Sequence, residues 1–110
     1  MIYSGTITLG SNAIAITDAT NGVALPAGAM ARRILIEPLR GNANAAYVGL
    51  STVTNNGTGV AIQELAAPAA GVVLDRFDDR AGGGSHNIDP SPLFVHGTSG
   101  QKLKVTIWTI

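Results

Sequence analysis

The residues best suited to metal chemistry are the two histidines, His86 and His96. A divalent metal site needs at least three ligands that converge on one point, and two histidines separated by one residue share a face of a strand. Here the histidines are ten residues apart and no His-x-His pair occurs. We therefore expect both to be loop or surface residues, with no bound metal and no cofactor.

Ser85, His86 and Asp89 contain the residue types of a Ser-His-Asp catalytic triad. Neighbouring residues of an extended chain point to opposite sides, so Ser85 and His86 would not meet. The Gly-x-Ser-x-Gly turn that exposes the nucleophilic serine of many hydrolases is also missing. We expect no catalytic residue and a protein that is not an enzyme.

Carboxylates in the second half of the chain could supply oxygen ligands for calcium, which takes six or more. The four candidates are Asp75, Asp78, Asp79 and Asp89. Their spacing differs from that of an EF-hand loop, and Arg76 and Arg80 lie among them. We expect local salt bridges in a solvated or interface loop over residues 78–85. Whether the Asp75–Asp79 cluster binds calcium stays open.

Arg32 and Arg33 form the one pair of adjacent cations. Adjacent side chains of a strand face opposite sides of the sheet, so this pair predicts no basic stripe. The chain carries seven Lys and Arg against seven Asp and Glu, whereas nucleic-acid binding needs a surplus of cations. We expect no nucleic-acid partner, and an inter-subunit ion pair for one of the two arginines.

The elements that position these residues follow from a recurring pattern. Short segments rich in Ile, Val and Thr are separated by Gly, Asn, Asp and Pro, which is typical of strands joined by turns. The expected strands cover residues 3–9, 13–17, 32–37, 45–50, 51–54, 59–65, 72–77, 93–96 and 102–110. The two helical candidates, residues 27–33 and 64–70, are short, and Pro68 interrupts the second. Asn56 and Gly57 predict a tight type I′ hairpin turn.

This pattern predicts an all-β fold with about eight short strands. We expect residues 1–110 to form a single antiparallel β-sandwich domain, jelly-roll-like, with residues 1–8 as an N-terminal arm that could add a strand to a neighbouring sheet. An immunoglobulin-like sandwich is the alternative, although its Cys…Trp…Cys signature is missing because the chain has no cysteine.

The composition suggests a surface that is covered by other molecules. Charged residues make up 13% of the chain, against about 25% in typical domains, and aromatic residues 5%. A soluble monomer of this size usually has more surface charge and a net charge away from zero. The chain shows neither a signal peptide nor an apolar run of about 18 residues. We therefore expect no membrane partner, and use in a cytoplasm or in a particle built there.

Five segments together resemble small virion proteins of tailed bacteriophages. They are Arg33–Pro38, Asn44–Gly49, Asn87–Asp89, Leu93–Gly97 and Gly100–Val105. The resemblance implies a capsid decoration (cement) protein, assembled in the host cytoplasm and located on the virion surface. Such a protein oligomerises, often as a trimer, binds the major capsid protein and staples neighbouring capsomers together. The family defines no catalytic residues.

The contact regions for such assembly are expected in three places. They are the N-terminal segment with Ile2 and Tyr3, the pair Arg32 and Arg33, and the charged loop with Asp78, Asp79 and Arg80. Two other functions remain alternatives. One is a phage tail, head-fibre or receptor-binding module for glycan or protein, which exposure of Trp108 and Tyr47 on one face would favour. The other is a small cupin-like protein that binds a metal or another ligand.

Overall fold

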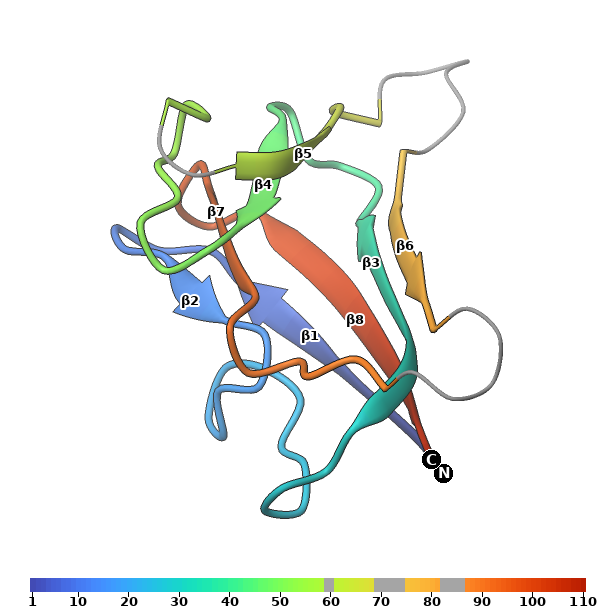
Figure 1. The fold of residues 1–110 in the computed structure, drawn as a ribbon. Coiled ribbons are helices and arrows are strands. Elements are labelled where there is room, and N and C mark those ends of the chain that lie inside the picture. Colours follow the sequence, from blue (N-terminus) through green and yellow to red (C-terminus); the bar gives the residue numbers. More distant parts are fainter. Residues whose placement is uncertain (59–60, 69–74, 82–86) are drawn as a thin grey trace.

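The computed structural model describes residues 1–58, 61–68, 75–81 and 87–110, which form eight strands and no helix (Figure 1). The strands are β1 (Ile2–Thr8), β2 (Ile14–Ala15), β3 (Ala31–Pro38), β4 (Ala46–Gly49), β5 (Ala61–Leu65), β6 (Phe77–Arg80), β7 (Phe94–Gly97) and β8 (Lys102–Thr109). The all-β prediction is therefore confirmed. Within these ranges no helix could span a membrane.

The strands make two four-stranded antiparallel sheets, in the orders β1-β8-β3-β6 and β2-β7-β4-β5. β1 pairs with β8, β2 with β7, β3 with β6 and β4 with β5. The chain thus folds like one long antiparallel ribbon whose successive strand pairs fall in alternate sheets. This connectivity is that of a jelly roll, as predicted. An immunoglobulin-like sandwich, in which the first two strands pair with each other, is excluded.

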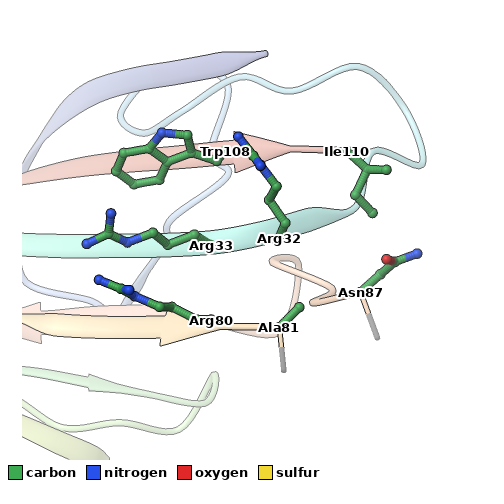
Figure 2. Close-up of a pocket in the computed structure, with 7 residues that line it drawn as sticks. All are labelled: Arg32, Arg33, Arg80, Ala81, Asn87, Trp108 and Ile110. Atoms are coloured by element: carbon green, nitrogen blue, oxygen red, sulfur yellow. The ribbon is translucent and has the colours of Figure 1, made fainter. Parts of the chain in front are cut away.

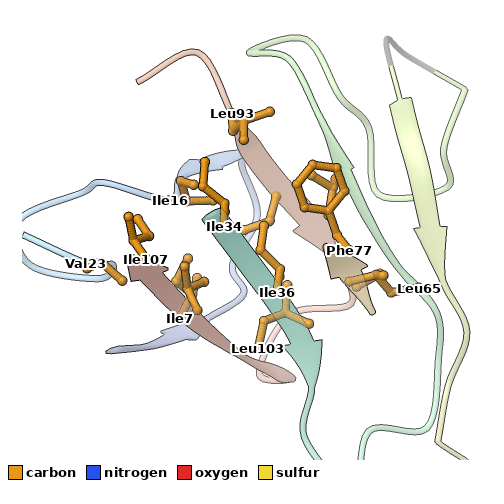
Figure 3. Close-up of a cluster of buried hydrophobic side chains, with 14 of the residues drawn as sticks. Ile7, Ile16, Val23, Ile34, Ile36, Leu65, Phe77, Leu93, Leu103 and Ile107 are labelled. Atoms are coloured by element: carbon orange, nitrogen blue, oxygen red, sulfur yellow. The ribbon is translucent and has the colours of Figure 1, made fainter. Parts of the chain in front are cut away.

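The core lies between the inner faces of the two sheets (Figure 3). Strict alternation along the strands places every second side chain inside, as in β8, where Leu103, Val105 and Ile107 are fully buried between exposed or half-buried neighbours. The other large side chains that are fully buried in strands are Ile7, Ile34, Ile36, Val48, Leu65 and Val95. The core is built mostly from aliphatic side chains, and Phe77 is the one buried aromatic residue in the described ranges.

Side-chain amides tie the loops to the sheet that carries β1 and β8. Asn21 accepts a hydrogen bond from the Thr8 N–H at 2.9 Å and donates one to the Thr8 carbonyl at 2.8 Å. Asn42 pairs in the same way with the backbone of Lys102. The Gln101 amide oxygen accepts hydrogen bonds from the backbone N–H groups of Ala43 and Asn44. These amides satisfy backbone groups that have no strand partner, all near the end of the sheet where Thr8 lies opposite Lys102.

Two predicted segments differ from the structure. Residues 51–54 are not a strand, and the connection between β4 and β5 is longer than a tight hairpin. A type I′ turn needs positive φ at two residues, but Gly57 has φ 76° and none of the described non-glycine residues has positive φ. Residues 1–8 are not a detached arm either, because β1 pairs with β8 along its whole length.

The loop expected over residues 78–85 is also corrected in its first part. Asp78, Asp79 and Arg80 belong to β6, which pairs with β3 from Phe77 opposite Ile36 to Arg80 opposite Arg33. Residues 82–85 of that predicted loop, and residues 72–74 of the strand expected before it, lie outside the described residues. A charged segment can form a strand here because β6 is at the sheet edge, where its outward side chains reach water.

Candidate binding surface

The outer face of the sheet β1-β8-β3-β6 carries regular rows of side chains, and we call it the outer face. Its first row runs across the four strands as Ile2, Trp108, Arg33 and Arg80, because these residues lie opposite one another in the registers. The second row is Ser4, Thr106, Leu35 and Asp78. Further along, Lys104 lies opposite Glu37 and Thr6, and Lys102 opposite Thr8. The outer face is therefore polar and cationic, with few apolar members.

An ion-pair network joins the edge of this face to its centre. Arg33 donates from Nε and Nη2 to the two carboxylate oxygens of Asp78, each at 2.9 Å. Arg80 donates to the same two carboxylate oxygens at 3.2 Å and 3.4 Å. These hydrogen bonds, from Arg33 first and Arg80 second, hold the pKa of the Asp78 carboxyl well below its ordinary value. The hydrogen bond to Asp78 in turn raises the pKa of Arg33.

Trp108 completes the network on the neighbouring strand. The Arg33 guanidinium carbon lies 4.6 Å from the centroid of the indole, within the range of a cation–π contact. Arg33 is thereby held between an aromatic ring and a carboxylate, and its side chain is 28% exposed. Arg80, by contrast, is 63% exposed. One arginine is a fixed part of the surface, while the other is open to a partner.

A β-bulge in β3 brings a third arginine, Arg32, next to Arg33 and Arg80. Ala31 lies opposite Thr109 and Arg33 opposite Trp108, so Arg32 is the extra residue on β3. Arg32 and Arg33 consequently line one groove of about 510 Å³, together with Arg80, Trp108, Asn87, Ala81 and Ile110 (Figure 2). The expectation that the two arginines face opposite sides is wrong, because the bulge breaks the strict alternation of the strand.

The zero net charge of the chain conceals an uneven distribution. The outer face and its groove hold five cations, Arg32, Arg33, Arg80, Lys102 and Lys104, against the two carboxylates of Asp78 and Glu37. Arg40 and Arg76 are the other cations of the chain, and five carboxylates lie elsewhere: Asp18, Glu64, Asp75, Asp79 and Asp89. An excess of three positive charges on one face is balanced by the same negative excess on the rest of the molecule.

Most of the expected contact residues come together here. Ile2, Arg32, Arg33, Asp78 and Arg80 lie on the outer face or in its groove. The other two do not: Tyr3 packs against the core, and Asp79 lies opposite the buried Ile34 on the inward side of β6. Trp108 and Asn87 were missed as members of the groove. The alternation of β8 places Trp108 on the same side as Lys102 and Lys104, so the position of Trp108 on the outer face could have been predicted from the sequence.

Of the two candidate metal ligands, the structure describes His96. His96 lies in β7, is 8% exposed and accepts a hydrogen bond at Nδ1 from the Gly97 N–H at 2.8 Å. It is a buried strand residue, which corrects the expected loop or surface position. His86 and Ser85 lie outside the described residues. In the part of the chain that the structure describes, no three His, Asp or Glu side chains come close enough to hold a metal ion.

The four aspartates do not form a shared oxygen site among the described residues. Asp78 holds Arg33 and Arg80, as described above. Asp75 accepts a hydrogen bond from the backbone N–H of Ala66 at 3.0 Å. Asp89 accepts hydrogen bonds from the N–H and hydroxyl of Ser91, which lower the pKa of its carboxyl. Each of these carboxylates therefore has a local structural partner.

The aromatic pair that would favour a receptor-binding module is split between the sheets. Trp108 lies on the outer face in β8, whereas Tyr47 lies in β4 of the other sheet. The Tyr47 hydroxyl donates to Glu64 at 3.3 Å, and Gly57 lies against the Tyr47 ring. The two rings do not form a common stacking platform, so this support for glycan binding is missing.

No protein family model matches the chain, and neither a curated protein nor a solved structure was found to be similar to it. The outer face and its groove are therefore the main indication of function.

Proposed function

We propose that the protein is a decoration protein of a bacteriophage capsid. It binds the major capsid protein on the outside of the shell, as a homo-oligomer, and holds neighbouring capsomers together. The resemblance of five sequence segments to small virion proteins supports this proposal, and so does the jelly roll, which is a recurrent fold of viral structural proteins. Lectins and cupins share this fold, so the fold alone does not assign the function, and the surface distinguishes among these classes of protein.

The observation that carries the proposal is the cationic outer face with its arginine groove. Arginine and aromatic residues are enriched in protein interfaces, and a central Trp–Arg pair is a common source of binding energy. The residues sit on a paired four-stranded sheet, so little backbone conformational entropy is lost when a partner binds. The positive excess selects a partner with exposed carboxylates. We propose that an acidic surface of the capsid supplies them.

The mechanism in this proposal is mechanical. The decoration protein makes many weak contacts across the junction of two shell subunits, and these contacts add up because both subunits are held at once. No turnover, cofactor or nucleic acid takes part. The resemblance suggests a trimer, and the protein would reside on the virion surface after assembly in the host cytoplasm.

The test is binding of the purified protein to capsid shells that lack it, measured by co-sedimentation. The double variant Arg32→Glu/Arg80→Glu reverses two charges of the groove and leaves the Arg33–Asp78 pair in place. We expect about tenfold weaker binding or more. The matched control Arg40→Glu/Arg76→Glu makes the same charge change at exposed residues that do not line the groove, and should bind like the wild type. Wild-type protein that stays in the supernatant, or equal losses for both variants, would refute the proposal.

A further inference from the structure

The outer edge of β1 presents backbone groups for which the described part of the chain offers no partner. Leu9 exchanges hydrogen bonds with Gln101 and Gly100 of the β8 side, and the Met1 carbonyl accepts one from the Thr109 N–H. In an antiparallel pair the direction of these groups alternates, so the odd-numbered residues of β1 point to β8. The N–H and C=O groups of Ile2, Ser4, Thr6 and Thr8 therefore point away from the sheet.

Among the described residues, partners are found for the last of these four. The Asn21 side chain occupies both backbone groups of Thr8. No described residue offers a hydrogen bond to the backbone of Ile2, Ser4 or Thr6 on the open side. These three residues are exposed, and together they form a template for one more strand.

The other sheet edges carry features that discourage pairing, whereas β1 carries none. β2 has two residues, β5 contains Glu64 and faces a bulge in the β4 register, and β6 contains three charged residues. Short length, charges and bulges are the usual protections of an edge strand. β1 is seven residues long, contains no charge and no proline, and has an unbroken register with β8. An unprotected edge of this kind can pair with a strand of another chain.

We infer that β1 pairs with β1 of a second copy of the chain, antiparallel and about a two-fold axis at Ser4. Ser4 of one copy then faces Ser4 of the other, and Ile2 faces Thr6, which gives about six hydrogen bonds between the copies. The two sheets join into one continuous sheet of eight strands. The contact is self-complementary, as two-fold interfaces require.

Electrostatics favours a second copy over other occupants of this edge. β1 has no charged side chain, so a charged partner strand would find no counter-ion on it. Stacking of two outer faces would instead bring like charges together, since each face has three more cations than carboxylates. Pairing through β1 avoids that repulsion and leaves both arginine grooves on the same side of the joined sheet, open to a partner.

This inference concerns the oligomerisation part of the proposed function, and it replaces the suggested trimer by a dimer or another even-numbered assembly. Mass measurement in solution tests it without capsids. If the dimer is absent but shells still bind the protein, the inference fails and the proposed function stands. If the dimer forms but shells do not bind the protein, the inference stands and the proposed function fails.

The experiment uses opposite charges at the two-fold position. Ser4→Lys and Ser4→Glu each place like charges opposite each other in a dimer, which weakens strand pairing. By native mass spectrometry and analytical ultracentrifugation we expect wild-type dimers, about tenfold weaker or absent dimers for each variant alone, and heterodimers when the two variants are mixed. The control Thr8→Glu adds a charge on the same strand and face, where Asn21 already occupies the backbone, and should remain dimeric.

A wild-type monomer or trimer at all concentrations would overturn the inference, as would variants whose mass equals that of the wild type. A second measurement needs no substitution. In the wild type the amide hydrogens of Ser4 and Thr6 should exchange slowly at high concentration and faster on dilution, because pairing alone protects them. Fast exchange of both amides at high concentration would exclude the pairing.

Discussion

Arg33 and Asp78 form a two-pronged ion pair between β3 and β6, with both N···O distances at 2.9 Å. The residues are 45 positions apart in the chain, so the pair connects the edge strand β6 to its neighbour β3. Two parallel hydrogen bonds fix the guanidinium plane, and this plane also faces Trp108. The same pair thus supports the sheet edge and shapes the groove.

The Arg33–Asp78 pair should make stability depend on pH. In the folded protein the pKa of the Asp78 carboxyl lies below its unfolded value of about 3.9. The contribution of the pair to stability is therefore present above about pH 5 and is lost as the pH falls further. Asp78→Asn should lower the Tm by a few degrees at neutral pH, and the difference from wild type should shrink on acidification. The control Asp79→Asn leaves the pair in place. A Tm difference between Asp78→Asn and the wild type that stays constant from pH 7 to pH 2 would show that the ion pair does not make stability depend on pH.

Gly57 should tolerate alanine less well than Gly28 does. Both have positive φ, 76° and 73°, so both substitutions carry a backbone cost of about 1–2 kcal/mol. A Cβ at Gly57 would lie 2.6 Å from Cε1 of Tyr47, whereas a Cβ at Gly28 meets nothing within 4 Å. Gly57→Ala should therefore lose more stability in urea unfolding than Gly28→Ala. Equal losses would show that the Tyr47 ring moves aside freely.

Gln101 should stabilise the loop between β3 and β4. Its side chain accepts hydrogen bonds from the N–H groups of Ala43 and Asn44 at 2.7 Å and 2.8 Å and donates one to the Asn44 carbonyl at 3.1 Å. Gln101→Ala removes all three and should cost about 1–2 kcal/mol, because water replaces part of the loss. Gln101→Glu keeps the acceptor and should cost less. Faster amide exchange at Ala43 and Asn44 in the alanine variant alone would identify the loop as the affected part.

The core should respond strongly to loss of volume at Leu103. This side chain is fully buried between the sheets, so Leu103→Ala removes apolar contacts and leaves a cavity, at a cost of about 2–5 kcal/mol. Leu50→Ala is the matched control, because Leu50 is 40% exposed. Chemical unfolding should separate the two variants clearly. Similar free energies of unfolding would mean that the sheets close over the missing side chain.

Local patterns were sufficient for most of the fold. Strict alternation in residues 102–109 predicts β8 because one side of the strand must face the core and the other water, and this holds wherever the rest of the chain lies. Eight short strands with little large apolar volume indicate two packed sheets rather than helices. The jelly-roll expectation followed from strand number and length, and the nested pairing of β1 with β8 through β4 with β5 confirms it.

The candidate surface depended on tertiary structure for its main features. Asp78 and Asp79 read as loop residues because nothing in the local sequence says that β3 lies beside them. The bulge that brings Arg32 and Arg33 to the same groove lies in the register between β3 and β8, two strands that are far apart in the sequence. In the same way, a chain with zero net charge has a strongly cationic face only because strands far apart in sequence become neighbours.

The sequence by itself determined which side chains of each strand face the core, since the period of two is a local property of the backbone. It also determined that charges are few and evenly matched in sign. Only the tertiary structure decided which strands are neighbours, which edge remains open and which charges share a face. These depend on pairing between distant strands, where hydrogen bonds join backbones of any sequence and the side chains merely select among registers.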